Sequence, residues 1–349
     1  MRALAAGLSA LALAACAGQP LASLPPANEV VARAETQPVG TANADAADDP
    51  AIWHNAADPA RSLIVGTDKK AGLYVYSLDG AIKSFNAAGQ LNNVALAQGT
   101  DGILVAASDR TDPAHSRIAL FALDLANGSL TKLGAVDSGP GEAYGLCMGP
   151  LSAQSTGERE EAMIYAALKD GTVREVRVSR ASGAVAGSIV REWKIATQIE
   201  GCVVNPHDDT LFVGEEMVGV WRIVLAEQDA QPVRFASVDG QQLVADVEGL
   251  ALATLADQRR ILLASSQGDN AYAAYDTADG TFLGRFRIVN SADGAMDGTS
   301  ETDGIDVVIG NFGPAYPGGL FVAQDGDNGS GTQNFKLVAW DDIAKALGL

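Results

Sequence analysis

The chain has 349 residues, of which 47% are hydrophobic and 19% charged, a composition typical of a folded protein rather than a disordered one. Its 43 acidic residues outnumber its 24 basic residues and give a formal net charge of −19 at pH 7. Such a surface repels phosphate backbones and anionic lipid heads, so we expect no nucleic-acid partner.

The first 16 residues have the features of an export signal. Arg2 supplies a positive charge, residues 3–15 are almost entirely apolar and small, and Leu13-Ala14-Ala15-Cys16 resembles a bacterial lipobox, whose cysteine is lipidated. The alternative is an ordinary cleaved signal with an incidental cysteine. We therefore expect an exported protein, either anchored to the outer membrane through Cys16 or free in the periplasm or outside the cell.

Residues 17–42 are rich in Ala and Pro, show little periodicity, and are predicted to be a tether. A single domain is predicted from residue 43 to residue 349. No later segment reaches the roughly 18 uncharged apolar residues of a membrane-spanning helix. We expect this domain to be a monomer.

The rest of the chain consists of short apolar runs separated by Gly, Asp, Asn and Pro, such as "SLIVGT", "GLYVYSL", "TLFVGEE" and "GGLFVAQD". Each run is typical of a β-strand bounded by turns. The runs group into six modules of about 45 to 58 residues, a period typical of propeller blades. The pattern predicts an all-β, six-bladed β-propeller, with a two-domain β-sandwich as the alternative. After "NFKLVAW" the sixth blade lacks a strand, which a segment before Asp48 would supply to close the ring.

Each module opens with a polar or acidic residue followed by small or apolar residues. The openings begin at Asp48-Asp49, Asn92-Asn93, Glu142, Glu200, Glu248 and Asp303. The first strand of each blade is expected to line the central channel, so these side chains should converge on one channel mouth. Clustered carboxylates raise one another's pKa and require a cation nearby. Oxygen ligands without His or Cys favour calcium.

Further acidic residues are candidates for the same role. Asp246 lies two residues before Glu248, Glu215-Glu216 ends a strand, and Asp297 lies in the loop "SADGAMDGTSETDG". The loop starting at Asp325 resembles a calcium loop, but position 12 of an EF-hand count is Lys336 rather than Glu. This loop is predicted to be either a structural calcium loop or a hairpin turn.

Basic residues are scarce, and several follow the second strand of a blade: Lys69-Lys70, Arg110 and Lys169. Facing the same mouth, they would suit a phosphate-bearing ligand. Covalent phosphatase motifs and a G-x-S-x-G elbow are absent from the sequence. Cys147 and Cys202 follow apolar patterns, which favours buried thiols. The alternative is a disulfide between them, because an exported protein would meet an oxidising environment.

Several stretches together resemble the calcium-dependent β-propeller phytases. They are "DDPAIWHNAADPARSLIVGTDKKAGLYVYSLDG", "VEGLAL", "LLASSQGDNAYAAYD", "DGTSETDGIDV" and "YPGGLFVAQDGDN" with "QNFKLVAW". The resemblance covers roughly residues 45 to 345 in matching order. It implies stepwise release of phosphate from phytate (myo-inositol hexakisphosphate) by attack of calcium-bound water, without a phosphoenzyme.

The resemblance also implies roles for particular residues. The implied calcium ligands are Asp48 or Asp49, Glu200, Glu216, Asp246, Glu248, Asp297 and Asp303, and Asp325 of the calcium-like loop is a further candidate. The implied phosphate-contacting residues are Lys69, Arg110, Tyr144 and Lys169, with Gln267 in the matching "SSQG". The predicted catalytic residues are Glu200, Lys69, Arg110, Tyr144 and Lys169.

One position departs from the family. Where it commonly has Asn-Asn-Val-Asp, this chain has Asn92-Asn93-Val94-Ala95, so a carboxylate is lost and we expect no ligand there. Two other functions remain as alternatives. They are a calcium-dependent propeller lactonase or esterase, which would not need the basic residues, and a non-catalytic binding lipoprotein.

Overall fold

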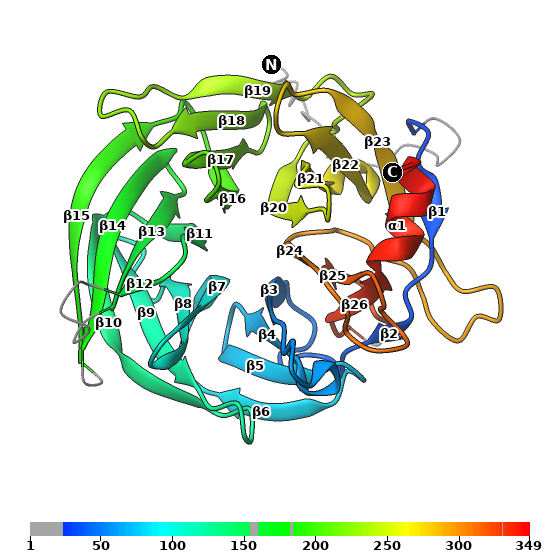
Figure 1. Cartoon of the computed structure of the whole chain (residues 1–349), viewed down its shortest axis with the longest axis horizontal. Coiled ribbons are helices and arrows are strands. Elements are labelled where there is room, and N and C mark those ends of the chain that lie inside the picture. Colours follow the sequence, from blue (N-terminus) through cyan, green and yellow to red (C-terminus); the bar gives the residue numbers. More distant parts are fainter. Residues whose placement is uncertain (1–23, 154–159, 182–183, 330) are drawn as a thin grey trace, which may run out of the picture.

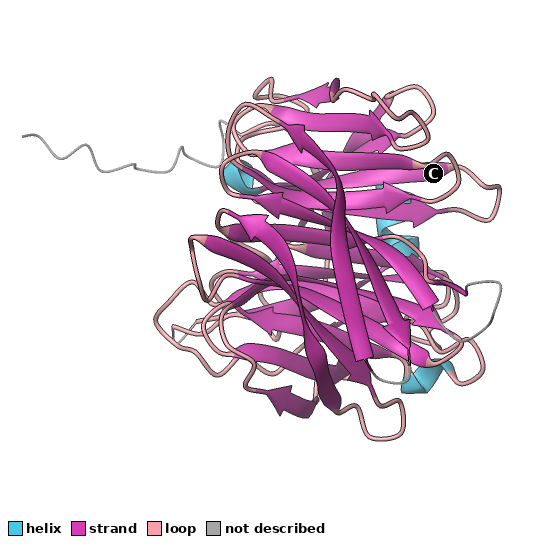
Figure 2. Cartoon of the chain, turned by 90° about the vertical axis from the view of Figure 1, so that its left-hand side faces the viewer, coloured by secondary structure: helices cyan, strands magenta, loops and turns pink. Residues whose placement is uncertain are grey.

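The computed structural model describes residues 24–153, 160–181, 184–329 and 331–349. The predicted signal peptide and Cys16 lie outside these residues. The described strands form six sheets arranged as a ring around a central channel, which confirms the predicted six-bladed propeller (Figure 1). Viewed from the side, strands cross the disc and loops project from both of its faces (Figure 2). No helix in the described part of the chain is both long and apolar enough to span a membrane.

In each blade the strands lie side by side, and their order in the sheet leads from the channel to the outer edge. The innermost strands are β3 (Ala47–Trp53), β7 (Leu91–Gly99), β11 (Ala143–Met148), β16 (Ile199–Asn205), β20 (Val247–Thr254) and β24 (Ile305–Ile309). The second strands are β4 (Leu63–Asp68), β8 (Gly102–Asp109), β13 (Glu160–Leu168), β17 (Thr210–Glu215), β21 (Arg260–Ser266) and β25 (Gly319–Asp325). The third strands are β5 (Gly72–Ser77), β9 (His115–Leu123), β14 (Thr172–Ala181), β18 (Gly219–Val224), β22 (Ala271–Asp276) and β26 (Asn334–Ala339).

The outer strands complete the blades. They are β6 (Ile82–Asn86), β10 (Leu130–Pro140), β15 (Ala184–Lys194), β19 (Val233–Ser237), β23 (Phe282–Ile288) and β2 (Ala34–Glu35). The remaining elements are β1 (Asn28–Val30), β12 (Ser152–Ala153), two short 3-10 helices at Pro59–Arg61 and Gln267–Asp269, and the helix α1 (Trp340–Leu347). The first strand of every module is therefore the innermost strand, as predicted.

The hydrophobic core is divided among the interfaces between neighbouring blades. In β4, Ile64 packs with residues of the sixth blade such as Leu320 and Phe335, whereas its neighbour Val65 packs with second-blade residues such as Phe121. Successive side chains of a strand point to opposite faces, so a strand buried on both faces is apolar at every position. This explains why the sequence shows continuous apolar runs rather than alternation.

The N-terminal segment closes the ring. β2 pairs with β26 and supplies the fourth strand of the sixth blade, which confirms the predicted closure. β1 adds a fifth, parallel strand to the fifth blade beside β23, and α1 packs against it (Figure 1). The prediction of a tether up to residue 42 is therefore wrong for residues 28–42, where Val30 and Val39 are buried. Pro and Ala are uncommon in strands, so the local sequence does not predict β1 and β2. Their pairing partners lie some 250 to 300 residues later in the chain, where no local pattern indicates them.

A disulfide joins Cys147 of β11 to Cys202 of β16, which corrects the preference for buried thiols. Both cysteines lie on innermost strands of adjacent blades, with their Cα atoms 5.6 Å apart. The predicted propeller places these two strands side by side, but the sequence pattern gives no register that would bring one cysteine opposite the other.

We expect the Cys147→Ser/Cys202→Ser double variant to unfold at a lower temperature than the parent, by roughly 5–10 °C. The two cysteines are 55 residues apart, and releasing a loop of that length costs about 4 kcal/mol in the chain-entropy model. Thermal unfolding with and without a reductant measures it. The reductant should lower the midpoint of the parent to that of the variant and leave the variant unchanged; an insensitive parent would contradict the prediction.

Candidate active site

The opening residues lie in backbone irregularities at the channel mouth. The pairing between first and second strands shifts register across Ala47/Pro50, Leu91/Val94, Ala143/Gly145, Ile199/Cys202 and Val247/Leu250. Such β-bulges leave residues unpaired and redirect their side chains. Four of these five shifts enclose the opening residue of their module, and the shift in the third blade encloses Tyr144, two residues after Glu142, so the repeated sequence feature corresponds to a repeated backbone feature.

Glycine follows the opening carboxylate where neighbouring blades nearly touch. A Cβ at Gly201 would lie 2.0 Å from the carbonyl oxygen of Glu248, and one at Gly249 would lie 2.6 Å from the amide nitrogen of Ile305. The backbone N–H of Gly249 instead donates to the carbonyl of Asp303 at 3.1 Å. Any side chain at these positions would push the blades apart and spread the carboxylates.

A cavity of about 360 Å³ lies at this end of the channel, and we call it the acidic mouth. It is lined by Asp45, Lys69, Tyr144, Gln198, Glu200, Glu216, Asp246, Glu248, Gln267, Glu301, Asp303, Gln324 and Gln333. One carboxylate oxygen each from Glu200, Glu216 and Glu248 lies within 4.8 Å of the others. The mouth thus brings together eight of the sequence-predicted residues from different blades.

These glutamates fit a bound cation. Glu248 is buried, and its Oε2 has no hydrogen-bond partner in the described structure. Burial raises the pKa of Glu200 to about 7, with the charge of Asp48 as the second cause, and burial raises the pKa of Glu248 well above its usual value. A buried carboxylate oxygen without a donor is costly unless a proton or metal ion satisfies it. The all-oxygen donor set suits calcium better than zinc or copper.

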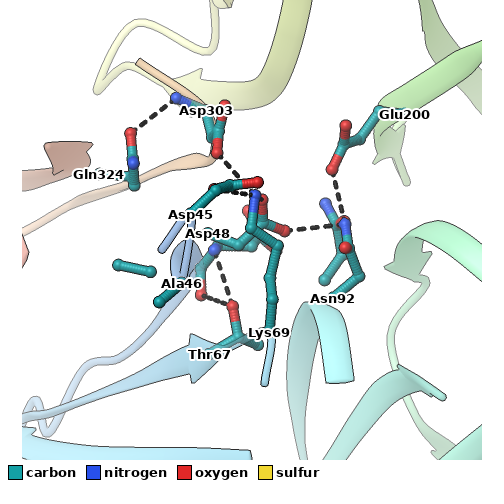
Figure 3. Close-up of polar contacts among 12 residues, drawn as sticks. Asp45, Ala46, Asp48, Thr67, Lys69, Asn92, Glu200, Asp303 and Gln324 are labelled. Atoms are coloured by element: carbon teal, nitrogen blue, oxygen red, sulfur yellow. Dashed lines mark hydrogen bonds and ion pairs between the residues drawn. The ribbon is translucent and has the colours of Figure 1, made fainter. Parts of the chain in front are cut away.

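Lys69 supplies an internal positive charge beside the glutamates. Its Nζ lies 2.6 Å from Asp45, 3.0 Å from Asp48 and 3.0 Å from Asp303, and its side chain is 7% exposed (Figure 3). These carboxylates raise the pKa of Lys69 despite its burial, so the ammonium stays charged. Gln267 donates to the second oxygen of Asp303 at 2.6 Å, while Gln324 accepts from the Asp303 backbone N–H.

Tyr144 links the mouth to two further cations. Arg110 lies 5.2 Å and Lys169 5.1 Å from the centre of its ring, both within cation–π range. Arg110 also pairs with Glu142 at 2.7 Å. Burial raises the pKa of the Tyr144 hydroxyl, helped by Glu200, so this hydroxyl remains a donor. The predicted convergence of Glu142 on the carboxylate cluster is wrong, because its carboxylate neutralises Arg110 instead.

The structure separates the neighbours Asp48 and Asp49. Asp48 faces Lys69 at the mouth, whereas Asp49 lines a cavity of about 240 Å³ deeper in the channel and accepts from the Val94 N–H at 3.0 Å. Ala95 borders the same deeper cavity. The carboxylate that this position lacks would therefore have faced the channel interior, not the acidic mouth.

Asp297 and Asp325 do not join the acidic mouth. They lie with Glu35 around the ammonium of Lys336, which is fully buried and also contacts Asn328. Lys336 is the residue at which the EF-hand count fails. The role of Asp297 and Asp325 as calcium ligands remains a prediction, with this ammonium at the centre of their cluster.

Sequence reasoning missed several residues of the mouth. Gln198 donates to Glu216 at 2.5 Å and reaches the Tyr144 hydroxyl at 3.5 Å, and Asp45 pairs with Lys69. Asn92 contacts Asp48, Glu200 and Arg110. Asn92 was visible only as the uncharged opening of the second module, and the amides of Gln198 and Gln324 carry no signal in the sequence.

Without calcium, the free energy of unfolding is expected to fall as pH rises from about 5 to about 8. A carboxyl group whose folded pKa is raised, as for Glu200 at about 7, binds more protons when folded, so its stabilising contribution is lost as pH rises through that value. Urea denaturation in a chelator at several pH values measures the fall. Saturating calcium should suppress it, and a chelated protein that gains stability over this range would contradict the assignment.

The acidic mouth thus combines a carboxylate cluster that is compatible with a metal ion and ammonium and guanidinium groups that suit phosphate esters, on a propeller fold. The chain belongs to the phytase family: the family model for phytase matches residues 1–349. It is 36% identical over 346 residues to the 3-phytase of Bacillus subtilis (strain 168), covering 92% of this chain and 86% of that protein. This match supports the phytase hypothesis over the lactonase and binding-lipoprotein alternatives.

Proposed function

We propose that this protein hydrolyses phytate, releasing phosphate stepwise in a calcium-dependent reaction at the acidic mouth. The observation that carries the proposal is the convergence of Glu200, Glu216 and Glu248, together with the buried Oε2 of Glu248, which has no hydrogen-bond donor in the described structure. The family match and the 3-phytase relative support the substrate.

The residues that would hold calcium are Glu200, Glu216 and Glu248, with Asp246 and Asp303 along the same cavity and Asp48 beside it on Lys69. Calcium bound there would supply Lewis-acid chemistry, neutralising phosphoryl charge and lowering the pKa of water. None of the described residues lining the cavity is Ser, Thr, Cys or His. The Tyr144 hydroxyl stays protonated and is a poor nucleophile. The carboxylates of the cavity would be engaged as calcium ligands, so the proposal includes direct attack by water rather than a phosphoenzyme.

The chain's cations would hold the phosphate groups. Lys69 and the Arg110–Tyr144–Lys169 group lie on opposite sides of the Asn92 amide, which contacts both Asp48 and Arg110. Phytate carries six phosphates on one ring, so one phosphate could lie at the glutamates while another contacts Arg110 and Lys169. Holding two phosphates orients the ring, which converts binding energy into positioning of the reacting group.

Phosphate release from phytate, with and without a calcium chelator, tests the function. We expect release in several steps in millimolar calcium and at least a 100-fold loss after chelation, restored by added calcium. A simple lactone and an aryl ester serve as control substrates. Absence of phosphate release in millimolar calcium would overturn the proposal, and calcium-dependent lactone cleavage would replace it.

We further propose export with lipidation at Cys16, supported by the N-terminal sequence alone. Metabolic labelling with a fatty acid tests this, using Cys16→Ala as the control. The parent should carry the label in the membrane fraction and the variant should not; equal behaviour of the two would leave an ordinary cleaved signal.

A further inference from the structure

Asn92 occupies the opening position of the second blade, where other blades place a carboxylate. Its side chain is fully buried, on the bulged strand β7, and it reaches across the channel mouth (Figure 3). The amide nitrogen donates to Asp48 at 2.9 Å and to Glu200 at 2.6 Å. Its carbonyl oxygen accepts from Nη1 of Arg110 at 2.6 Å.

These three contacts use the two N–H groups of the amide and one lone pair of its oxygen. The carboxylates belong to the first and fourth blades, and Arg110 follows the second strand of the second blade. One uncharged side chain thus separates two buried carboxylates and holds a guanidinium. An Ala would leave all three groups without these partners, and an Asp would place a third carboxylate against the other two.

Arg110 depends on few other contacts. Its second terminal nitrogen pairs with the half-buried Glu142, and its plane lies over Tyr144. Fixing both Nη1 and Nη2 leaves the guanidinium in one orientation, so the remaining N–H groups have a defined direction. Without Asn92, only the pair with Glu142 and the contact with the Tyr144 ring would hold the head of this long side chain, and Nη1 would lose its acceptor.

We propose that Asn92 is a positioning residue that orients Arg110 for a substrate phosphate while it keeps Asp48 and Glu200 apart. This inference rests on the proposed function, because it takes Arg110 as a phosphate-binding group. Asn92 acts through Arg110 and the carboxylates and touches no substrate itself.

A double-mutant cycle between Asn92 and Arg110 tests the proposal on the full-length protein in saturating calcium. The probe is myo-inositol hexakissulfate, an anionic analogue of phytate without phosphate esters, and calorimetry measures its Kd without any turnover. We expect Arg110→Ala and Asn92→Leu each to raise this Kd about tenfold. The double variant should bind no more than about twofold more weakly than Arg110→Ala alone, because the two residues act as one unit.

Asn92→Asp is the second arm of the test, because it keeps an acceptor for Arg110, loses the donors, and adds a negative charge beside Asp48 and Glu200 that saturating calcium compensates. In saturating calcium its Kd for the analogue should stay within about threefold of the parent. In kinetics with phytate, Asn92→Leu should raise KM and Asn92→Asp should restore it. Asn92→Ser, whose short hydroxyl does not reach Arg110, replaces Asn92→Leu if that variant fails to fold.

Additive penalties in the cycle, or an Asp variant as weak as the Leu variant, would overturn the role of Asn92 while leaving phytate hydrolysis untouched. The converse outcome is also distinguishable. A parent protein that binds the analogue but releases no phosphate would reject the proposed function, and the binding cycle would still support or overturn the role of Asn92.

Discussion

Glu200→Gln is expected to reduce phosphate release from phytate by about 1000-fold while leaving the propeller folded. Glu200 contributes an oxygen to the three-glutamate cluster and accepts from Asn92, so it lies between the calcium ligands and the substrate-side cations. Gln has nearly the same shape but no charge, so it removes one ligand charge without opening a cavity. Loss of a single charge-stabilising group at a reacting centre commonly costs two to three orders of magnitude.

The measurement combines initial rates in millimolar calcium with calcium binding and thermal unfolding. The calcium affinity of the variant should fall together with its rate, and its unfolding midpoint in a chelator should match or exceed that of the parent, since a buried charge is gone. Glu192→Gln provides a matched control, because this half-exposed glutamate pairs with Arg174 on outer strands. Near-normal activity of Glu200→Gln would reject the cluster as the active site.

Lys69→Met is expected to lower kcat/KM for phytate by about 100-fold while calcium binds at least as tightly as in the parent. The Lys69 ammonium pairs with Asp48 and Asp303, two of the predicted calcium ligands, so it competes with the metal for the same oxygens. Removing it frees those carboxylates for calcium but removes a donor for a phosphate oxygen. The unbranched Met side chain fills the same buried space.

Calcium titration by calorimetry and steady-state kinetics separate these effects. The calcium-free variant should also be less stable than the parent, because Asp48 and Asp303 lose their compensating charge. Lys70→Met is the matched control, since Lys70 is its exposed neighbour. A variant that loses calcium affinity but keeps its KM for phytate would show that Lys69 supports the metal site and not the substrate.

The blade repeat and the convergence of Glu200, Glu248 and Asp303 could be predicted from the sequence because both depend on periodic features of single modules. Contacts between modules could not be predicted in the same way. The partners of Cys147, Asp297 and the residues before position 43 lie on other blades or at the opposite end of the chain. The sequence does not distinguish the roles of Asp48 and Asp49. In the structure the bulge at Ala47/Pro50 places the Asp48 side chain beside Lys69 and the Asp49 side chain at the deeper cavity.

Amides were the least visible part of the site. Asn92, Gln198, Gln267 and Gln324 carry no charge, and their value comes from partners that lie 18 or more residues away in the sequence. A glutamine that accepts from a backbone N–H, as Gln324 does for Asp303, leaves no spacing rule in the sequence.

The way the chain closes its ring brings its first and last described elements, β1 and α1, close together. Asn28 at the start of β1 donates to the carbonyl of Ala346 near the end of α1 at 2.5 Å, so the first and last elements meet on one flank of the disc. The joint between the sixth and first blades also carries the Lys69–Asp303 pair across the mouth. A short linker from the end of α1 to the start of β1 would therefore permit circular permutation with new termini in a loop of another blade, while the existing passage from β2 to β3 keeps the sixth and first blades covalently joined.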